Sequence, residues 1–227
     1  MEHILDNPIY HALSSGHSHI AKGNDEVKYY NEEITAFAGL KDNSAENLNT
    51  LYQISPAESL FVFFSNKAIE IPAQWKLLTQ IDMFQFIFRG KEIPVIDTAD
   101  ITDLNDEHVL EMIDLVELTK PGPFLAKTIQ LSNYTGIFAD GKLAAMAGHR
   151  FFPSPYREVS AVCTHPDHLG KGYAFKVIQE QIKRILLRSE IPFLHVRNDN
   201  EGAIKLYHKL GFEIRTEMIA YVIKKEV

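Results

Sequence analysis

The sequence predicts a mixed α/β protein, and three observations in its C-terminal half support that prediction. Apolar stretches that favour strands alternate there with amphipathic stretches that favour helices. An Asp140-Gly141 pair between two apolar stretches indicates a tight hairpin, hence antiparallel strands. Between Val159 and Ala174 an apolar strand ends in a glycine-containing turn that leads directly into a helix. Strands that alternate with helices are typical of a sheet covered by helices.

The composition is that of an ordinary globular protein. The 227 residues are 45% hydrophobic and 23% charged, enough for one large domain or two of common size. The single cysteine, Cys163, excludes an internal disulfide and indicates a reducing compartment. The N-terminus lacks the pattern of a secretory signal, and no apolar run approaches membrane length. We therefore expect a soluble cytoplasmic protein without a membrane partner.

Charge is divided unevenly along the chain. Residues 1–118 contain 7 Lys or Arg against 20 Asp or Glu, whereas residues 119–227 contain 16 against 10. A basic C-terminal half favours an anionic ligand, although solvated faces of different charge explain the split equally well. The positive residues are not gathered into a patch with interleaved aromatic residues, so we expect no nucleic-acid partner.

In the N-terminal half the patterns predict both helices and strands. Asn7 and Pro8 form an N-cap and first-turn pair that opens a short helix. A second helix is predicted over residues 43–54, and a buried strand over Ser59–Ser65. Residues 76–88 fit either a helix leading into a strand or two strand pieces. No catalytic constellation is visible in this half.

The C-terminal half begins with a predicted helix over residues 103–118. Its apolar residues recur at spacings of three and four: Val109, Met112, Ile113 and Val116. Prolines and a glycine then stop it, and strands Tyr134–Phe138 and Lys142–Phe151 form the hairpin. The further predicted elements are the strand Glu158–Thr164, a helix ending before Pro192, the strand Phe193–Val196, a helix capped by Asn200 and ended by Gly211, and the strand Glu213–Ile223.

The glycine turn has the properties of a phosphate-binding site. Gly170 and Gly172 carry no Cβ, so the backbone can approach a ligand and direct successive N–H groups at it. Those groups also belong to the first turn of the next helix, where intrahelical acceptors are missing and the dipole favours an anion. A turn that merely connects strand to helix would explain the glycines as well.

Two motifs in this half resemble a known family. The segment THPDHLGKGYA, followed by NDNEGAIKLYHKLGF, is similar to the acyl-coenzyme A binding core of the GNAT N-acetyltransferase superfamily. In the turn, Gly172 and Ala174 match the family pattern, whereas Leu169 stands where the family has Gln or Arg. The second motif is matched by Asn200, Ala203, Tyr207, Gly211 and Phe212. The resemblance covers about residues 100–227.

The resemblance also implies an architecture. We expect a GNAT domain over residues 101–227, with a mixed, mostly antiparallel sheet flanked by helices. Residues 1–100 are expected to form an N-terminal α/β domain. By analogy with two-domain members, including the glycine N-acyltransferase-like branch, this domain is expected to be a degenerate second copy of the fold. We expect a monomer or a homodimer.

For the acyl donor, the resemblance implies acetyl-coenzyme A as co-substrate and no metal. Its pantetheine arm would hydrogen-bond to the main chain of Val162, Cys163 and Thr164. Its pyrophosphate would lie on the turn, contacting Leu169, Gly170, Lys171, Gly172, Tyr173 and Ala174. Asn200, Ala203 and Tyr207 from the second motif would complete the cofactor site.

The chemistry expected is direct acyl transfer to a primary amine within a ternary complex. Tyr207 is the predicted general acid toward the coenzyme A sulfur, although it also fits the apolar face of its helix. Glu158, at the start of the central strand, is the predicted general base, with a solvated strand-end glutamate as the alternative. His149 and Glu117 are reserve candidates for the base.

We expect the acceptor, a small amine or a peptide N-terminus, to bind near the loop Thr119–Phe124. Carboxylates on the preceding helix could attract a cationic amine: Glu107, Glu111, Asp114 and Glu117. An acyl-cysteine intermediate at Cys163 is disfavoured because no histidine partner is evident. The histidines His11, His17 and His19 lack the further ligands of a metal site. The alternative function is a non-catalytic acyl-coenzyme A sensor.

Overall fold

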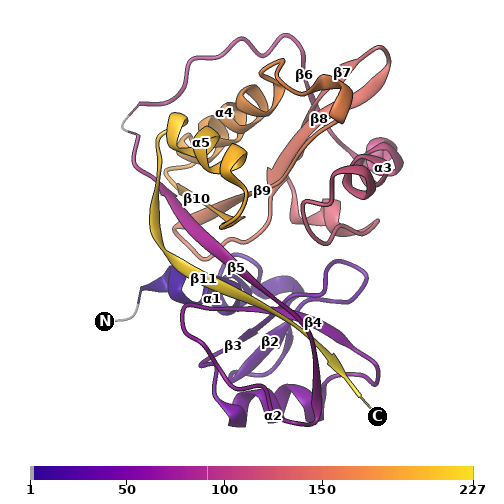
Figure 1. Ribbon diagram of the computed structural model, residues 1–227, viewed down its shortest axis with the longest axis vertical. Helices are drawn as coiled ribbons and strands as arrows, with labels where there is room; N and C mark the ends of the chain where they lie inside the picture. The colour runs from indigo at the N-terminus through magenta and orange to yellow at the C-terminus, as the bar shows by residue number, and fades with distance from the viewer. Residues whose placement is uncertain (1–2, 91, 227) are drawn as a thin grey trace.

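The computed structural model describes residues 3–90 and 92–226 and is built around one eight-stranded sheet (Figure 1). The strand order is β4-β11-β5-β10-β9-β8-β7-β6. The strands are β4 (Leu60–Ser65), β5 (Trp75–Phe88), β6 (Ile101–Asp103), β7 (Thr135–Ala139), β8 (Lys142–His149), β9 (Tyr156–Thr164), β10 (Ile191–Arg197) and β11 (Phe212–Lys225). The described pairs are antiparallel except β9–β10, which confirms the predicted mixed, mostly antiparallel sheet.

Helices cover both faces of this sheet. The helix α3 (Val109–Thr119) packs on Met146 and Cys163, whereas α4 (Tyr173–Leu186) packs on Ala147. Because consecutive residues of a strand point to opposite faces, Met146 and Ala147 place α3 and α4 on opposite sides. The helix α5 (Glu201–Lys209) shares an apolar cluster with α4. The sheet near β9 is therefore enclosed between α3 on one side and α4 with α5 on the other.

A second, three-stranded sheet lies in the N-terminal region. It has the order β1-β2-β3 and consists of β1 (Lys22–Gly23), β2 (Val27–Tyr29) and β3 (Ala38–Leu40). The helices α1 (Pro8–Ser14) and α2 (Ala45–Ile54) accompany it, capped by the Asn7 and Ser44 side chains. Single 3-10 turns occur at Ile4–Asp6, Ser18–Ile20, Asp106–His108, Thr128–Leu131 and Pro166–His168.

The large sheet runs across residue 100. The strand β5 pairs with both β10 and β11, and β11 pairs in turn with β4. In Figure 1 the two long strands β5 and β11 run side by side from the helical part of the molecule into the N-terminal part. Residues 1–100 and 101–227 thus share one sheet. That residues 1–100 form a domain of their own, or a degenerate copy of the fold, stays a prediction.

The structure departs from the sequence-based elements in three places. Residues 76–88, which fitted a helix or strands, lie in the single strand β5, because β10 and β11 supply partners on both its edges. The predicted helix over 103–118 begins later, at Val109, since Ile101–Asp103 pairs with β7 as β6. The small sheet β1-β2-β3 was not predicted: its strands have only two or three residues, too few to show alternation.

Candidate active site

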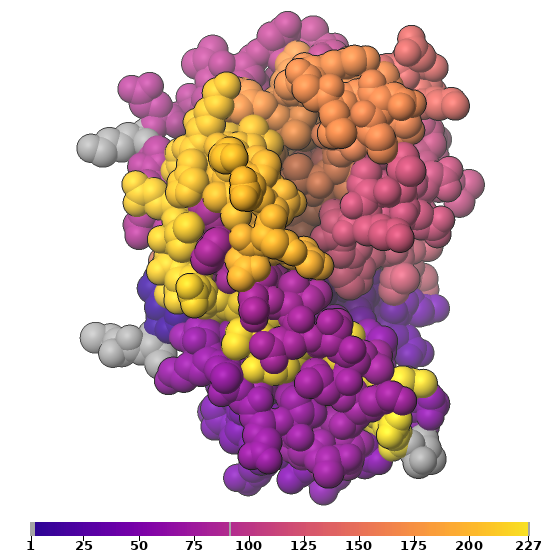
Figure 2. Space-filling view, in the orientation of Figure 1, coloured from indigo at the N-terminus to yellow at the C-terminus, as the bar shows by residue number. Residues whose placement is uncertain are grey.

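The candidate site begins where the two parallel strands separate. β9 and β10 are paired only from Tyr156 with Ile191 to Glu158 with Phe193. Beyond Glu158, β10 stays paired with β5, and β9 stays paired with β8, so the edge of β9 that faces β10 has no strand partner. Figure 2 shows the surface hollowed between the segments that contain α3 and α5. An extended ligand could add to this open edge by main-chain hydrogen bonds.

A bulge interrupts β9 within the open stretch. The register with β8 shifts between Met146, opposite Cys163, and Gly148, opposite Ser160. Ala161 and Val162 have no partner in that register, and Ala161 has a φ of 50°, in the left-handed region that non-glycine residues rarely adopt. Bulges of this kind turn main-chain groups away from the ladder. Here the bulge leaves Ala161 and Val162 outside the ladder with β8.

The glycine turn follows β9 as the sequence predicted. Gly170 and Gly172 have φ values of 75° and 81°, and Gly172 immediately precedes α4. A Cβ added to either glycine would meet no atom within 4 Å, so left-handed backbone conformation, not crowding, requires glycine here. No described side chain caps the start of α4. Its first N–H groups therefore have no side-chain acceptor among the described residues, and the nearby Leu169 is exposed.

Side chains of the predicted pantetheine-binding stretch have different surroundings. The Thr164 hydroxyl is buried and has no hydrogen-bond partner in the described chain. The Cys163 thiol packs beneath α3, and burial raises its pKa to about 11. A thiol with that pKa is protonated at neutral pH and is a poor nucleophile. The geometry thus gives no support to an acyl-cysteine intermediate.

On the other side of the opening, α5 presents the second motif. The Asn200 side chain accepts the Ala203 N–H at 3.1 Å, so Asn200 caps the helix as predicted. Tyr207 is 6% exposed and packs near the rings of Phe86 and Phe212. Its hydroxyl donates to no described residue, and burial raises its pKa. The phenol therefore keeps its proton at neutral pH and has that proton free to donate.

Glu158 is the centre of a buried charged cluster. Its carboxylate accepts Nε of Arg150 at 2.8 Å and Nη2 at 2.6 Å, and lies 2.6 Å from Nδ1 of His195. Although the carboxylate is fully buried, the Arg150 charge and these hydrogen bonds lower its pKa to about 2. A carboxylate with that pKa and three contacts is a weak base. These contacts argue against the predicted role of Glu158 as general base.

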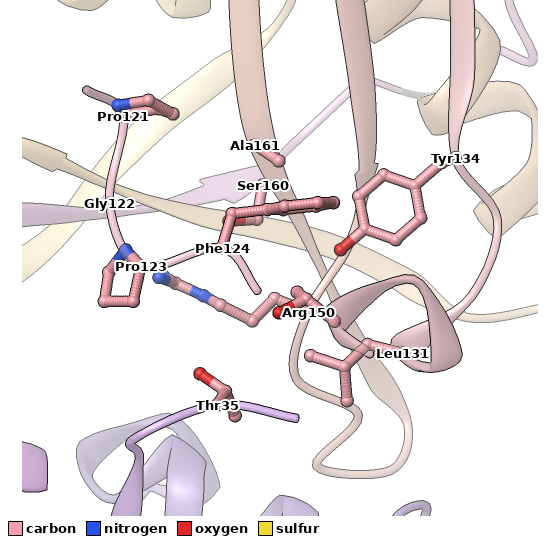
Figure 3. A pocket seen from close by; sticks show the side chains of 11 residues that line it. Thr35, Pro121, Gly122, Pro123, Phe124, Leu131, Tyr134, Arg150, Ser160 and Ala161 are labelled. Carbon is pink, nitrogen blue, oxygen red and sulfur yellow. The ribbon is translucent and has the colours of Figure 1, made fainter. Parts of the chain in front are cut away.

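A pocket lies beside this cluster, on the side of the sheet that faces α3. Its walls are Thr35, Pro121, Gly122, Pro123, Phe124, Thr128, Leu131, Tyr134, Arg150, Ser160 and Ala161. In Figure 3 the Arg150 guanidinium extends between Thr35 and the loop Pro121–Phe124, with Tyr134 opposite. The predicted acceptor loop thus forms one wall. Ser160 and Ala161 connect the pocket to the bulge in β9.

Other predicted candidates lie away from this pocket. None of the four carboxylates on or just before α3 is among its lining residues, and Glu117 is exposed. His149 is buried, and burial lowers its pKa, which keeps it neutral. Nδ1 of His17 lies 2.8 Å from the Tyr30 hydroxyl, a core contact. Within residues 3–90 and 92–226, no group of three or more His, Cys, Asp or Glu could hold a metal ion.

Three residues of the pocket were not predicted from the sequence: Arg150, Thr35 and Tyr134. Arg150 had a signal: a lone charge that ends an apolar strand and lies eight residues before Glu158, across a turn. A buried cross-strand pair is the usual reason for such a charge. Thr35 had none, because the other lining residues are far from it in the sequence, between Pro121 and Ala161.

Comparisons with known proteins identify the fold. The family model described as "FR47-like protein" matches residues 134–220. A solved structure from Novosphingobium aromaticivorans is described as a GNAT-family acetyltransferase. It aligns with this chain over the full length of both chains, with a TM-score of 0.91 and 29% sequence identity. The fold and the matched family model are those of the GNAT superfamily of acyltransferases. The glycine N-acyltransferase-like branch is not confirmed.

Two further relatives define how far the likeness extends. A GCN5-related N-acetyltransferase from Kribbella flavida covers 96% of both chains at a TM-score of 0.60 and 12% identity, which shows the GNAT fold alone. "N-alpha-acetyltransferase RimI" from Mycobacterium tuberculosis is 30% identical over 86 residues, 36% of this chain. The match spans about half of that relative's length. Among the described residues, none of the helices could serve as a membrane span.

Proposed function

We propose that this GNAT protein is an N-acetyltransferase that moves an acetyl group from acetyl-coenzyme A to a primary amine by direct transfer. The observation that carries the proposal is the opened, bulged edge of β9 directly before a glycine turn at the start of α4. That edge can take a pantetheine arm as an added strand, and the turn can take a pyrophosphate. The matched GNAT family supports the same donor.

In the proposed donor complex, main-chain groups of Val162, Cys163 and Thr164 bind the pantetheine. The turn from Leu169 to Ala174 binds the pyrophosphate, with added charge from Lys171, whose Nζ lies 2.9 Å from Nδ1 of His168. Asn200 and Ala203 border the same groove from α5. The main-chain N–H of Val162 or Cys163 would stabilise the oxygen of the thioester as negative charge develops on it.

The transfer itself needs one acid and a neutral amine. The amine nitrogen forms a bond to the thioester carbonyl carbon, and the carbon–sulfur bond breaks. Tyr207 donates its hydroxyl proton to the departing sulfur, and the proton that the amine nitrogen loses restores the phenol. The ammonium form of the acceptor gives up its extra proton to water before attack. Glu158 acts by holding Arg150 in place, not as the base.

The acceptor is proposed to be an α-amine, on a small molecule or at a peptide N-terminus. The Mycobacterium tuberculosis relative is named as an N-alpha-acetyltransferase, which supports this class of nucleophile. A monomer or a homodimer remains the proposed assembly.

Thiol release from acetyl-coenzyme A, followed across a panel of amines, tests the proposal. Tyr207→Phe should lower kcat by about a hundredfold while the KM for acetyl-coenzyme A stays unchanged, because a positioned acid contributes that order of rate. The control is Tyr29→Phe, whose hydroxyl makes one long contact to the Ile54 carbonyl far from the site. Binding of acetyl-coenzyme A without thiol release from any amine would favour the sensor alternative.

A further inference from the structure

We infer that the pocket around Arg150 binds a carboxylate group of the acceptor, so that the acceptor is a free amino acid and not a simple amine, polyamine or peptide. This inference rests on the proposed acetyl transfer and names its substrate class. We place the acceptor in this pocket because Ser160 and Ala161 line it and also belong to the bulged strand where the thioester would lie. An amine bound there would be next to the reacting carbonyl.

Arg150 is the only charged residue among the pocket's lining residues. Its Nε and Nη2 donate to Glu158, while Nη1 has no acceptor among the described residues. The guanidinium is held rigidly: its carbon lies 5.0 Å from the Phe37 ring centre and 4.7 Å from that of Phe151. A fixed guanidinium with an unused edge is a ready partner for a carboxylate.

Two hydroxyls add donors to this edge. Thr35 is 1% exposed, its hydroxyl has no partner within the described chain, and Figure 3 shows it pointing toward Arg150 across the pocket. Tyr134 is 3% exposed, and its hydroxyl also makes no hydrogen bond to a described residue. The buried Thr35 hydroxyl, which has no partner in the described chain, costs stability unless a ligand supplies one. A carboxylate can accept from the guanidinium and from both hydroxyls at once.

The same pocket disfavours a second positive charge. No Asp or Glu lines it, and the nearby Glu158 carboxylate is already neutralised by Arg150. A polyamine would therefore bring an ammonium group that finds no carboxylate among the lining residues. The carboxylates on α3 that could have attracted a cation lie outside the lining.

The N-terminal region supplies one wall of the pocket. The Thr128 hydroxyl donates to the Ile34 carbonyl at 2.6 Å, and Lys127 pairs with Glu33 at 2.7 Å. These contacts hold the segment that carries Thr35 against the segment after the Pro121–Phe124 loop. The region before β4 thus has a role in choosing the acceptor. Thr35 from this region closes one side of the pocket.

The test compares the twenty amino acids with their α-amides, with ethylamine, with spermidine and with a tripeptide, by thiol release at saturating acetyl-coenzyme A. At least one amino acid should show a kcat/KM at least tenfold above that of its own amide. The comparison is stringent, because the amide has the more easily deprotonated amine. Equal or better activity with the amide, ethylamine, spermidine or the tripeptide would overturn the inference while leaving acetyl transfer intact.

Thr35→Val then removes one donor and keeps the side-chain shape. We expect the KM for the preferred amino acid to rise about tenfold, with its kcat and the KM for its amide nearly unchanged. Arg150→Lys keeps a cation beside Glu158 but loses the free guanidinium edge, and should raise the same KM further. The matched control is Thr79→Val, an exposed threonine on β5. If the variants lower kcat/KM equally for the amino acid and its amide, the residues have a structural role, and carboxylate binding is contradicted.

A readout that needs no turnover completes the test. Calorimetric titration of the preferred amino acid into the protein loaded with coenzyme A should give binding that Thr35→Val weakens. If coenzyme A binds but no amino acid does, the inference fails. If coenzyme A itself does not bind to the folded protein, the proposed function fails instead.

Discussion

The glycine turn follows the end of β9, whereas the Arg150 pocket lies beside the bulge in the middle of that strand, and each is suited to an anionic group. The turn offers main-chain N–H groups in the open, at Gly170, Gly172 and the start of α4. The pocket offers a side-chain guanidinium that is 16% exposed and fixed by a buried carboxylate. A main-chain site depends on backbone conformation, whereas a buried charge depends on its partner. Removing the partner of Arg150 should therefore lower stability, whereas substitutions of the turn glycines should lower affinity for the donor.

The largest difference should come from Glu158→Ala. This change leaves the Arg150 guanidinium without its partner, and removing one partner of a buried pair costs about 3–5 kcal/mol of unfolding free energy. Asp167→Ala removes an exposed carboxylate at the turn and should change stability by less than about 0.5 kcal/mol. Urea unfolding of both variants makes the comparison. Similar midpoints would contradict a structural role for the Glu158–Arg150 pair.

The ion pair between Glu158 and Arg150 should also contribute to the pH dependence of stability. The pKa of Glu158 is about 2 in the folded protein against an ordinary value of 4.5, so folding favours the ionised form. That contribution is present above about pH 4.5 and is lost as the pH falls toward 2. It amounts to about 3 kcal/mol, since each pH unit is worth about 1.4 kcal/mol. Glu158→Gln should flatten the dependence of unfolding free energy on pH over this range, relative to wild type; an unchanged slope would show that other carboxylates dominate.

At the turn, Gly172→Ala should act on the donor alone. An alanine held at a φ of 81° costs about 1–2 kcal/mol, which the turn can relieve by changing the direction of its N–H groups. The KM for acetyl-coenzyme A should rise about tenfold, and the KM for the acceptor should stay the same. Gly202→Ala, in α5 with nothing closer than 3.9 Å to the added Cβ, is the control. A rise in the acceptor KM instead would mean that the two sites are not separate.

The smallest expected effect is a gain in affinity for coenzyme A. Leu169 is 66% exposed and stands where GNAT proteins have Gln or Arg, so Leu169→Arg adds a charge beside the proposed pyrophosphate site without disturbing the core. An exposed charge contact is worth about 0.5–1 kcal/mol, which predicts a roughly threefold to fivefold lower Kd for coenzyme A. The gain should shrink in high salt. A salt-independent change would point to a different cause.

The contrast between the two regions also explains what could be predicted from the sequence. The turn was visible because its requirements are local: two glycines at fixed spacing, an N-terminal helix end, and a second motif from Asn200 to Phe212. The order of strands and helices after residue 130 was visible for the same reason, through alternation and helical spacing. Each of these signals lies within a short stretch of chain.

The pocket could not be predicted because distant segments build it. Thr35, the Pro121–Phe124 loop and Arg150 are brought together only by the folded sheet. Contacts between distant segments also explain why the role of Glu158 was hard to predict. Its position on β9 suggested a base, but Arg150 and His195, from other parts of the chain, make it an ion-pair partner. The insertion of β5 between β10 and β11 was likewise invisible, since strand pairing depends on contacts far apart in sequence.

Both the turn and the open edge of β9 are proposed to bind acetyl-coenzyme A, so calorimetric titration of the folded wild-type protein with this ligand is the decisive experiment. We expect saturable binding with one molecule per chain, weakened by Gly172→Ala and unaffected by Thr35→Val. Absence of binding heat in a sample whose thermal unfolding shows an intact fold would contradict it.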